Sequence, residues 1–193
     1  MSALLTLRFT KLSADRHRFE YRRADGTGEA IEMETRSFLT HDLVHYAVES
    51  EAGLKGSFYG ILARIGGYEE LSVAGGAALG GEIAITERIV GALQGALADD
   101  DLDAAAFQAQ VAEYLELFDE RAPRWFTPAF VAAVRERMRL LTGRWKATPF
   151  GETMELAFGP SPSGGGSSAR SVDGVAKSEG SIRIAGGASD NPT

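Results

Sequence analysis

The chain has 193 residues, of which 44% are hydrophobic and 24% are charged, and its formal net charge is −7 at pH 7. These proportions are typical of a folded domain and exclude a fully disordered chain or a coiled coil. The excess of negative charge argues against general affinity for nucleic acids, which needs a positive surface. The chain has no cysteine, so disulfides, thiolate zinc sites and a cysteine nucleophile are excluded.

Two features of the sequence bear on where the protein works. No apolar run approaches the roughly 20 residues that a membrane-spanning helix needs. The first residues, MSALLTLRFTKL, lack the basic start and the sustained apolar core of a signal peptide. We therefore expect a cytoplasmic protein with no membrane span, no nucleic-acid partner, and a small molecule or a protein as its ligand.

The first part of the chain alternates between apolar and polar residues with a period of two, which is typical of half-buried strands. This alternation covers residues 3–10, 17–22 and 31–34. An Asp-Gly pair, Asp25 and Gly26, lies between the second and third of these segments and is typical of a tight hairpin. The pattern predicts a three-stranded antiparallel meander.

Helical periodicity follows and predicts helices near 38–50, 54–65, 82–98, 104–119 and from Pro128 to Gly143. Residues 144–148 and 153–158 flank a Pro-Phe-Gly turn and predict a C-terminal hairpin, which could join the first sheet or pair only with itself. We expect an α+β fold in which an antiparallel sheet packs against four to five helices.

The composition changes at Gly159, after which glycine and serine dominate and large apolar side chains almost vanish. Such a segment cannot bury enough apolar surface to offset the entropy that ordering costs. The sequence therefore predicts one globular domain over residues 1–158, followed by a disordered Gly/Ser-rich tail over residues 159–193.

Residues 40–50, THDLVHYAVES, contain two of the chain's three histidines. On a helix of about 100° per residue, His45 lies about 40° from His41, and Glu49 about 80° from it. Side chains four residues apart on a helix can share one ion. We therefore predict a divalent-metal site, with zinc, iron or manganese as candidates, whose ligands are His41, His45 and Glu49.

Asp42 and Glu51 are the candidate proton acceptors beside such a site. Metal-assisted hydrolysis or binding of a substrate oxygen would use the open coordination positions, and a nearby carboxylate would take up the proton. Asp42 could instead orient an imidazole. Glu51 would fall on the apolar side if the helix continued, so we expect the helix to stop near Ser50, because Gly53 follows and glycine often ends helices.

The string HDLVH at 41–45 resembles the HDxxH signature of the ubiquinone-biosynthesis accessory proteins. The resemblance implies a zinc ion held by the motif and by a glutamate about a dozen residues further on. His41, Asp42 and His45 match that motif, whereas Ser57 stands at the position of the glutamate. Those proteins are largely helical, and this chain opens with strands. The longer string HDLVHYAVES, with its HDxxHxxxE spacing, also resembles bacterial proteins of unassigned function, which implies no particular chemistry.

A purely structural role for these histidines is the alternative to a metal site. Histidines at the border of a core are often hydrogen-bonded structural residues, and His–Glu pairs four residues apart stabilise a helix without an ion. His17 shares one side of its strand with Phe19 and Tyr21, so we expect it in the core beside the sheet. It could complete a three-histidine site only if the sheet packed over the 38–50 helix.

The stretch 121–146 is rich in arginine and suggests a second kind of function. Arg135 and Arg139 lie one turn apart on the predicted solvent side of their helix, where they could receive an acidic partner. The alternative function is therefore a non-enzymatic adaptor or regulatory module that uses this arginine-rich helix surface.

Overall fold

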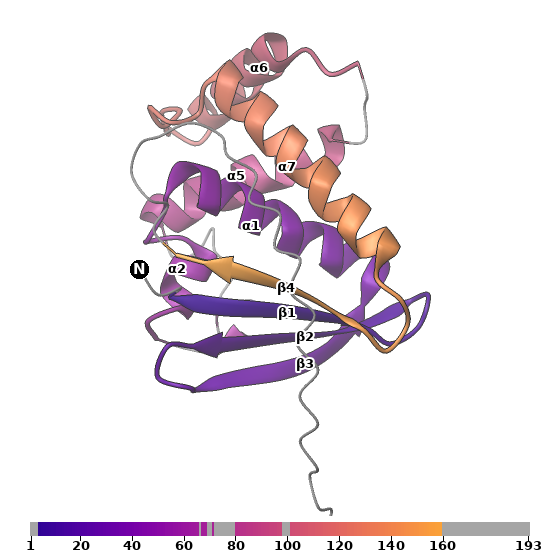
Figure 1. Cartoon of the computed structure of the whole chain (residues 1–193). Helices are drawn as coiled ribbons and strands as arrows, with labels where there is room; N and C mark the ends of the chain where they lie inside the picture. Colours follow the sequence, from indigo (N-terminus) through magenta and orange to yellow (C-terminus); the bar gives the residue numbers. More distant parts are fainter. Residues whose placement is uncertain (1–3, 66, 69–70, 72–79, 98–100, 160–193) are drawn as a thin grey trace, which may run out of the picture. The chain divides into compact units, whose positions relative to one another are not determined.

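A four-stranded antiparallel sheet carries the helices on one of its faces (Figure 1). The computed structural model describes residues 4–65, 67–68, 71, 80–97 and 101–159. The strands lie in the order β3-β2-β1-β4 and are β1 (Leu5–Lys11), β2 (Arg16–Arg23), β3 (Gly28–Glu34) and β4 (Thr153–Phe158). The first three strands form the predicted meander, and the α+β prediction is confirmed.

The alternation of the strands separates a buried face from a charged one. Leu7 of β1 lies opposite Tyr21 of β2 and Leu156 of β4, and all three side chains are buried. On the other face, Arg18 pairs with Glu32 at 2.8 Å across β2 and β3. The sheet therefore presents one apolar surface, and the helices cover that surface.

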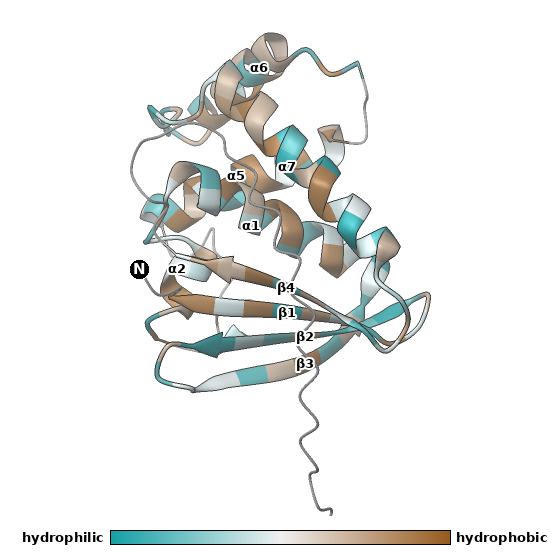
Figure 2. Cartoon of the chain, in the orientation of Figure 1, coloured by the Kyte–Doolittle hydropathy of each residue, from teal (hydrophilic) through white to brown (hydrophobic). Residues whose placement is uncertain are grey.

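Helix α1 lies over the sheet, α5 and α7 pack against α1, and α6 lies furthest from the sheet (Figure 1). α1 contacts α2, α5 and α7, and a short π-helix, η1, leads into it. Strands β1 and β4 and helices α1 and α5 carry extended apolar stretches (Figure 2). The helical elements are η1 (Thr35–Leu39), α1 (Thr40–Ala52), α2 (Phe58–Leu62), α5 (Gly81–Ala96), α6 (Ala104–Glu116) and α7 (Pro128–Ala147).

The predicted C-terminal hairpin is wrong, because only its second segment is a strand. α7 continues through Gly143 to Ala147, and its buried stripe ends at Trp145, which is 9% exposed. Lys11 of β1 donates hydrogen bonds to the carbonyl oxygens of Trp145 and Thr148 at 2.6 and 2.5 Å, which satisfies the end of this helix. β4 joins the first sheet by pairing with β1.

The predicted tail lies outside the described residues from residue 160 onward. None of the helices among the described residues combines the length and the apolar character that crossing a membrane requires. The helix predicted over 54–65 is shorter than expected and is restricted to α2.

His17 is fully buried on the face of the sheet that the helices cover, where its Nδ1 lies 3.3 Å from Thr35 Oγ1 and its ring lies against Phe9 and Trp145. Burial lowers the pKa of His17 from 6.5 to about 4. The pKa of His17 is lower in the folded protein than in the unfolded one. The contribution of neutral His17 to the unfolding free energy is therefore complete above pH 6.5 and is lost as the pH falls toward 4. Each pKa unit corresponds to about 1.4 kcal/mol.

We therefore predict that His17→Gln flattens the acid side of the stability profile. Between pH 7 and pH 4, the wild type should lose on the order of 3 kcal/mol more unfolding free energy than the variant. Urea denaturation of both proteins at the two pH values measures this difference. Equal losses in the two proteins would show that His17 is not the group responsible.

Candidate metal centre

The polar edge of the HDLVHYAVES helix is buried, because α1 packs against α5 and α7 as well as α2. His45 is 2% exposed and Glu49 is 0% exposed. Ionisable groups at this depth need partners, since an unpaired buried charge costs several kcal/mol. The residues that face His45 and Glu49 therefore decide what this helix can do.

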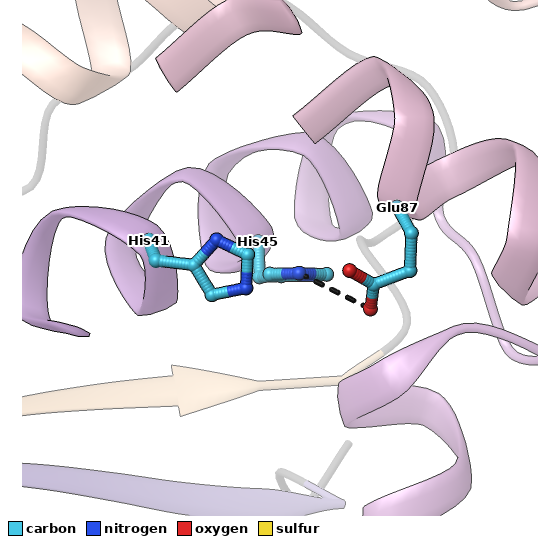
Figure 3. A group of neighbouring side chains, drawn as sticks. All are labelled: His41, His45 and Glu87. Atoms are coloured by element: carbon cyan, nitrogen blue, oxygen red, sulfur yellow. Dashed lines mark ion pairs between the residues drawn. The ribbon is translucent and has the colours of Figure 1, made fainter. Parts of the chain in front are cut away.

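His41 and His45 of α1 and Glu87 of α5 point toward one another (Figure 3). Ligand atoms of the three side chains all lie within 4.8 Å of one another, and His45 Nε2 is 3.4 Å from Glu87 Oε1. The two imidazole rings are 4.6 Å apart, in an edge-on arrangement. Two imidazoles and one carboxylate in this arrangement could hold a metal ion.

Glu49 fixes the orientation of His45. Its Oε1 lies 3.1 Å from His45 Nδ1, and a carboxylate only accepts, so Nδ1 donates and Nε2 is turned toward Glu87. Glu49 Oε2 accepts hydrogen bonds from the backbone amides of Tyr59 and Gly60 at 2.9 and 3.3 Å. These amides belong to the first turn of α2, so one carboxylate orients an imidazole and satisfies a helix end.

Gln94 of α5 fixes the orientation of His41. His41 Nδ1 lies 3.1 Å from Gln94 Oε1, and this amide oxygen can only accept a hydrogen bond. Nδ1 of His41 therefore donates, and the other ring nitrogen is left as the ligand atom. Both histidines of the centre thus have their Nδ1 atoms anchored on oxygens, which is how metal-binding histidines are commonly oriented.

Without a metal, the centre holds a proton. Burial by itself lowers the pKa of His45, but its contacts with Glu49 and Glu87 outweigh burial and raise that pKa to about 10. Burial and the neighbouring charge of His45 lower the pKa of His41. Burial raises the pKa of Glu87, but the contact with His45 outweighs it and the net shift is downward. The two carboxylates therefore favour a cation between them.

Asp42 follows His41 in α1 and lies outside the group of three ligand candidates. Its Oδ1 accepts a hydrogen bond from the Tyr68 hydroxyl at 3.1 Å, whereas its buried Oδ2 has no hydrogen-bond partner within the described ranges. Burial raises the pKa of Asp42 to about 7. The predicted proton acceptor is thus a buried carboxyl whose pKa is close to neutral pH.

Glu51 lies outside the candidate metal centre, and α1 does not stop near Ser50 as expected. The helix continues to Ala52, and Gly53 ends it with φ 65°. Glu51 forms an ion pair with Arg137 of α7 at 2.6 Å, so the carboxylate that the sequence left without a partner has one on the neighbouring helix. This pair is half-buried and contains none of the candidate ligands.

The arginines of α7 are engaged with groups of this chain. Arg139 pairs with Glu136 at 2.7 Å, and Arg135 donates to the carbonyl oxygen of Leu102 at 3.1 Å. With the Arg137–Glu51 pair, two of the five basic residues of α7 are therefore ion-paired with carboxylates. The adaptor function based on this surface stays a prediction.

Glu87 and Gln94 are the residues that sequence reasoning missed. Both belong to the predicted 82–98 helix, and Ile83, Glu87, Val90 and Gln94 follow one another at spacings of four, three and four residues. That spacing places all four on one face. Ile83 and Val90 are buried. A glutamate and a glutamine on the same buried face could therefore have indicated that α5 contributes polar groups to a site.

The two roles of Glu49 make it more important for stability than Glu51, two residues further along the same helix. We predict that Glu49→Ala lowers the unfolding free energy by about 3 kcal/mol, because it leaves a buried imidazolium and two amides without their acceptor. Glu51→Ala should cost less than about 1 kcal/mol, because its ion pair is half-exposed. Chemical denaturation of the metal-free proteins compares them, and equal losses would contradict this assignment.

Comparison with protein families, with curated proteins and with solved structures finds no match to this chain. The likeness of HDLVH to the zinc motif of the ubiquinone-biosynthesis accessory proteins therefore stays a prediction. At the position of their distal glutamate, Ser57 is buried at the start of α2. In this chain, the carboxylate that faces both histidines comes from α5.

Proposed function

We propose that this protein binds a divalent metal ion through His41, His45 and Glu87. The observation that carries the proposal is the anchoring of both Nδ1 atoms, on Gln94 and on Glu49, which leaves two Nε2 atoms beside one carboxylate. Two histidines and one glutamate are the ligands of hydrolytic zinc sites that keep an open position, and a related set binds iron(II). Zinc is the first candidate, followed by iron and manganese.

Within this proposal, Glu49 orients a ligand and is not itself the third ligand. Both of its oxygens are used, one by His45 Nδ1 and the other by the amides of Tyr59 and Gly60. Direct ligation by Glu49 would require it to give up at least one of these buried contacts. Glu87 has no such commitment to the backbone of α2 and supplies the ligand oxygen.

We also propose that the site binds a substrate oxygen and can support hydrolysis. When bound, a divalent ion supplies Lewis acidity to a substrate oxygen or to water. Asp42 supports this extension, because its carboxyl interacts electrostatically with His45 and Glu87 and its pKa of about 7 suits a group that accepts and returns protons near neutral pH. Tyr68 holds that carboxyl in place. Glu51 is bound to Arg137 and takes no part.

Metal binding tests the proposal directly. The wild type should bind one zinc ion per chain, and Glu87→Gln should weaken binding at least about 100-fold, because it replaces a charged ligand at a partly exposed position. Glu49→Gln should weaken it about 10- to 100-fold, which is typical when a group that orients a ligand is changed. Competition with a chelating dye measures these affinities.

Glu51→Gln is the matched control and should bind zinc as the wild type does, because Glu51 contacts α7. His41→Ala should lose binding while remaining folded, since His41 is less buried than His45. The proposal is wrong if the wild type binds none of zinc, iron(II) and manganese stoichiometrically. It is also wrong if Glu51→Gln loses as much affinity as Glu87→Gln.

The charge state of His45 gives an independent prediction. With a pKa of about 10, His45 is protonated at pH 7.5 and must lose its proton to become a ligand, whereas the pKa of His41 is already lowered. Zinc binding at pH 7.5 should therefore release about one proton per ion. Calorimetric titrations in buffers with different ionisation enthalpies measure this number. A binding enthalpy that does not depend on the buffer would contradict the proposed role of His45.

A further inference from the structure

A groove of about 790 Å³ lies between α5 and α6, and Glu87 forms part of its wall. Volumes of about 300–1,000 Å³ are typical of sites for small molecules. Glu87 also belongs to the candidate metal centre. One carboxylate therefore borders both the buried histidines and an opening large enough for a ligand.

Small residues of α5 make room for this groove. Gly91, Ala92, Gly95 and Ala96 line it, and Gly91 and Gly95 follow Glu87 at spacings of four residues along the helix. A Cβ atom added at Gly91 or at Gly95 would meet no atom within 4 Å. Either glycine could therefore carry a larger side chain, which would project into open space and fill the groove.

The rest of the groove wall is mostly apolar, and Gln110 is an uncharged polar side chain in it. Phe107 and Val111 of α6 line it opposite α5. Arg88 also lines it, but its charge is paired with Glu120 at 2.6 Å. A charged group of a ligand is thus expected to bind at the end of the groove where Glu87 borders the metal centre. The remaining wall suits apolar groups.

His45 provides the second observation that points to a ligand at this end. It is 98% buried, and its Nε2 forms an ion pair with Glu87 at 3.4 Å but no hydrogen bond within the described part of the chain. Buried polar nitrogens normally have a hydrogen-bond partner or a metal. The ligand-binding atom of His45 is therefore directed at the residue that lines the groove.

We propose that the groove receives the apolar body of a small amphipathic acyl compound whose oxygen-donor head binds at the metal centre. This inference rests on the metal site proposed above and names the class of substrate for it. Two neutral imidazoles, one carboxylate and a divalent ion carry a net charge of +1, which favours an anionic oxygen head such as a carboxylate or a hydroxamate. The apolar wall favours an alkyl or aromatic body.

Alkyl hydroxamates of increasing length test this inference by calorimetry on the zinc-loaded protein. Each buried methylene group strengthens binding about threefold to fourfold. Octanohydroxamate has the same head as acetohydroxamate and about six more methylene groups, so it should bind on the order of 1,000-fold more tightly if the groove buries them all. In Gly91→Leu and in Gly95→Leu, the preference for the longer chain should fall below about tenfold while affinity for zinc and for acetohydroxamate stays within about twofold.

Gly143→Leu is the matched control. Gly143 is also a helical glycine with no atom within 4 Å of an added Cβ, and it lies in α7, outside this groove. All three substitutions replace glycine by a strong helix former, so they should preserve the fold. The control should retain the full preference for octanohydroxamate. The inference is overturned if the wild type shows no preference for the longer chain, or if Gly143→Leu removes the preference and Gly91→Leu does not.

A parallel series with the metal-free protein separates this inference from the metal proposal. Without zinc, all hydroxamates should bind more weakly, but the preference for the longer chain and its loss in Gly91→Leu should persist. If zinc does not bind and the preference persists, the metal proposal fails and the apolar groove stands. If zinc binds and chain length has no effect in either form, the metal site stands and the groove is not the substrate site.

Discussion

The structure depends on one buried contact, the pair between His45 and Glu49 at 3.1 Å in the middle of α1. Burying an ionised group without a partner would cost several kcal/mol, so these residues constrain the elements around them. Glu49 holds the first amides of α2, and His45 faces Glu87 of α5. The position of two neighbouring helices is thus coupled to the charge of a single imidazole.

This constraint joins the fold to the candidate function. The apolar face of the sheet requires a covering helix, and α1 supplies it while the neighbouring helices bury its polar edge. Oxygen anchors on the Nδ1 atoms of His41 and His45 then leave the Nε2 atoms beside Glu87. A groove along α5 reaches that carboxylate. Glu87 therefore contacts the buried histidines on one side and lines the open groove on the other.

The sequence predicted the elements that local patterns specify. Period-two alternation gave the meander, and the histidine spacing identified α1 as the place of the centre. The sequence patterns did not predict contacts between elements that are far apart in the chain. Arg137 lies 86 residues from Glu51, and its ion pair gives that carboxylate a partner on another helix. Glu87 lies 42 residues from His45, so helical geometry on α1 alone favoured Glu49 as the nearest carboxylate. The predicted strand at 144–148 failed because Trp145 extends the buried stripe of α7.

Anomalous diffraction at the zinc edge, from crystals of the zinc-loaded protein, would locate the metal ion and its ligands. We expect one peak bonded to Nε2 of His41, Nε2 of His45 and a carboxylate oxygen of Glu87, with Glu49 still bonded to His45 Nδ1 and to the amides of α2. A peak bonded to Glu49 in place of Glu87, or crystals of saturated protein with no peak beside the two histidines, would contradict this expectation.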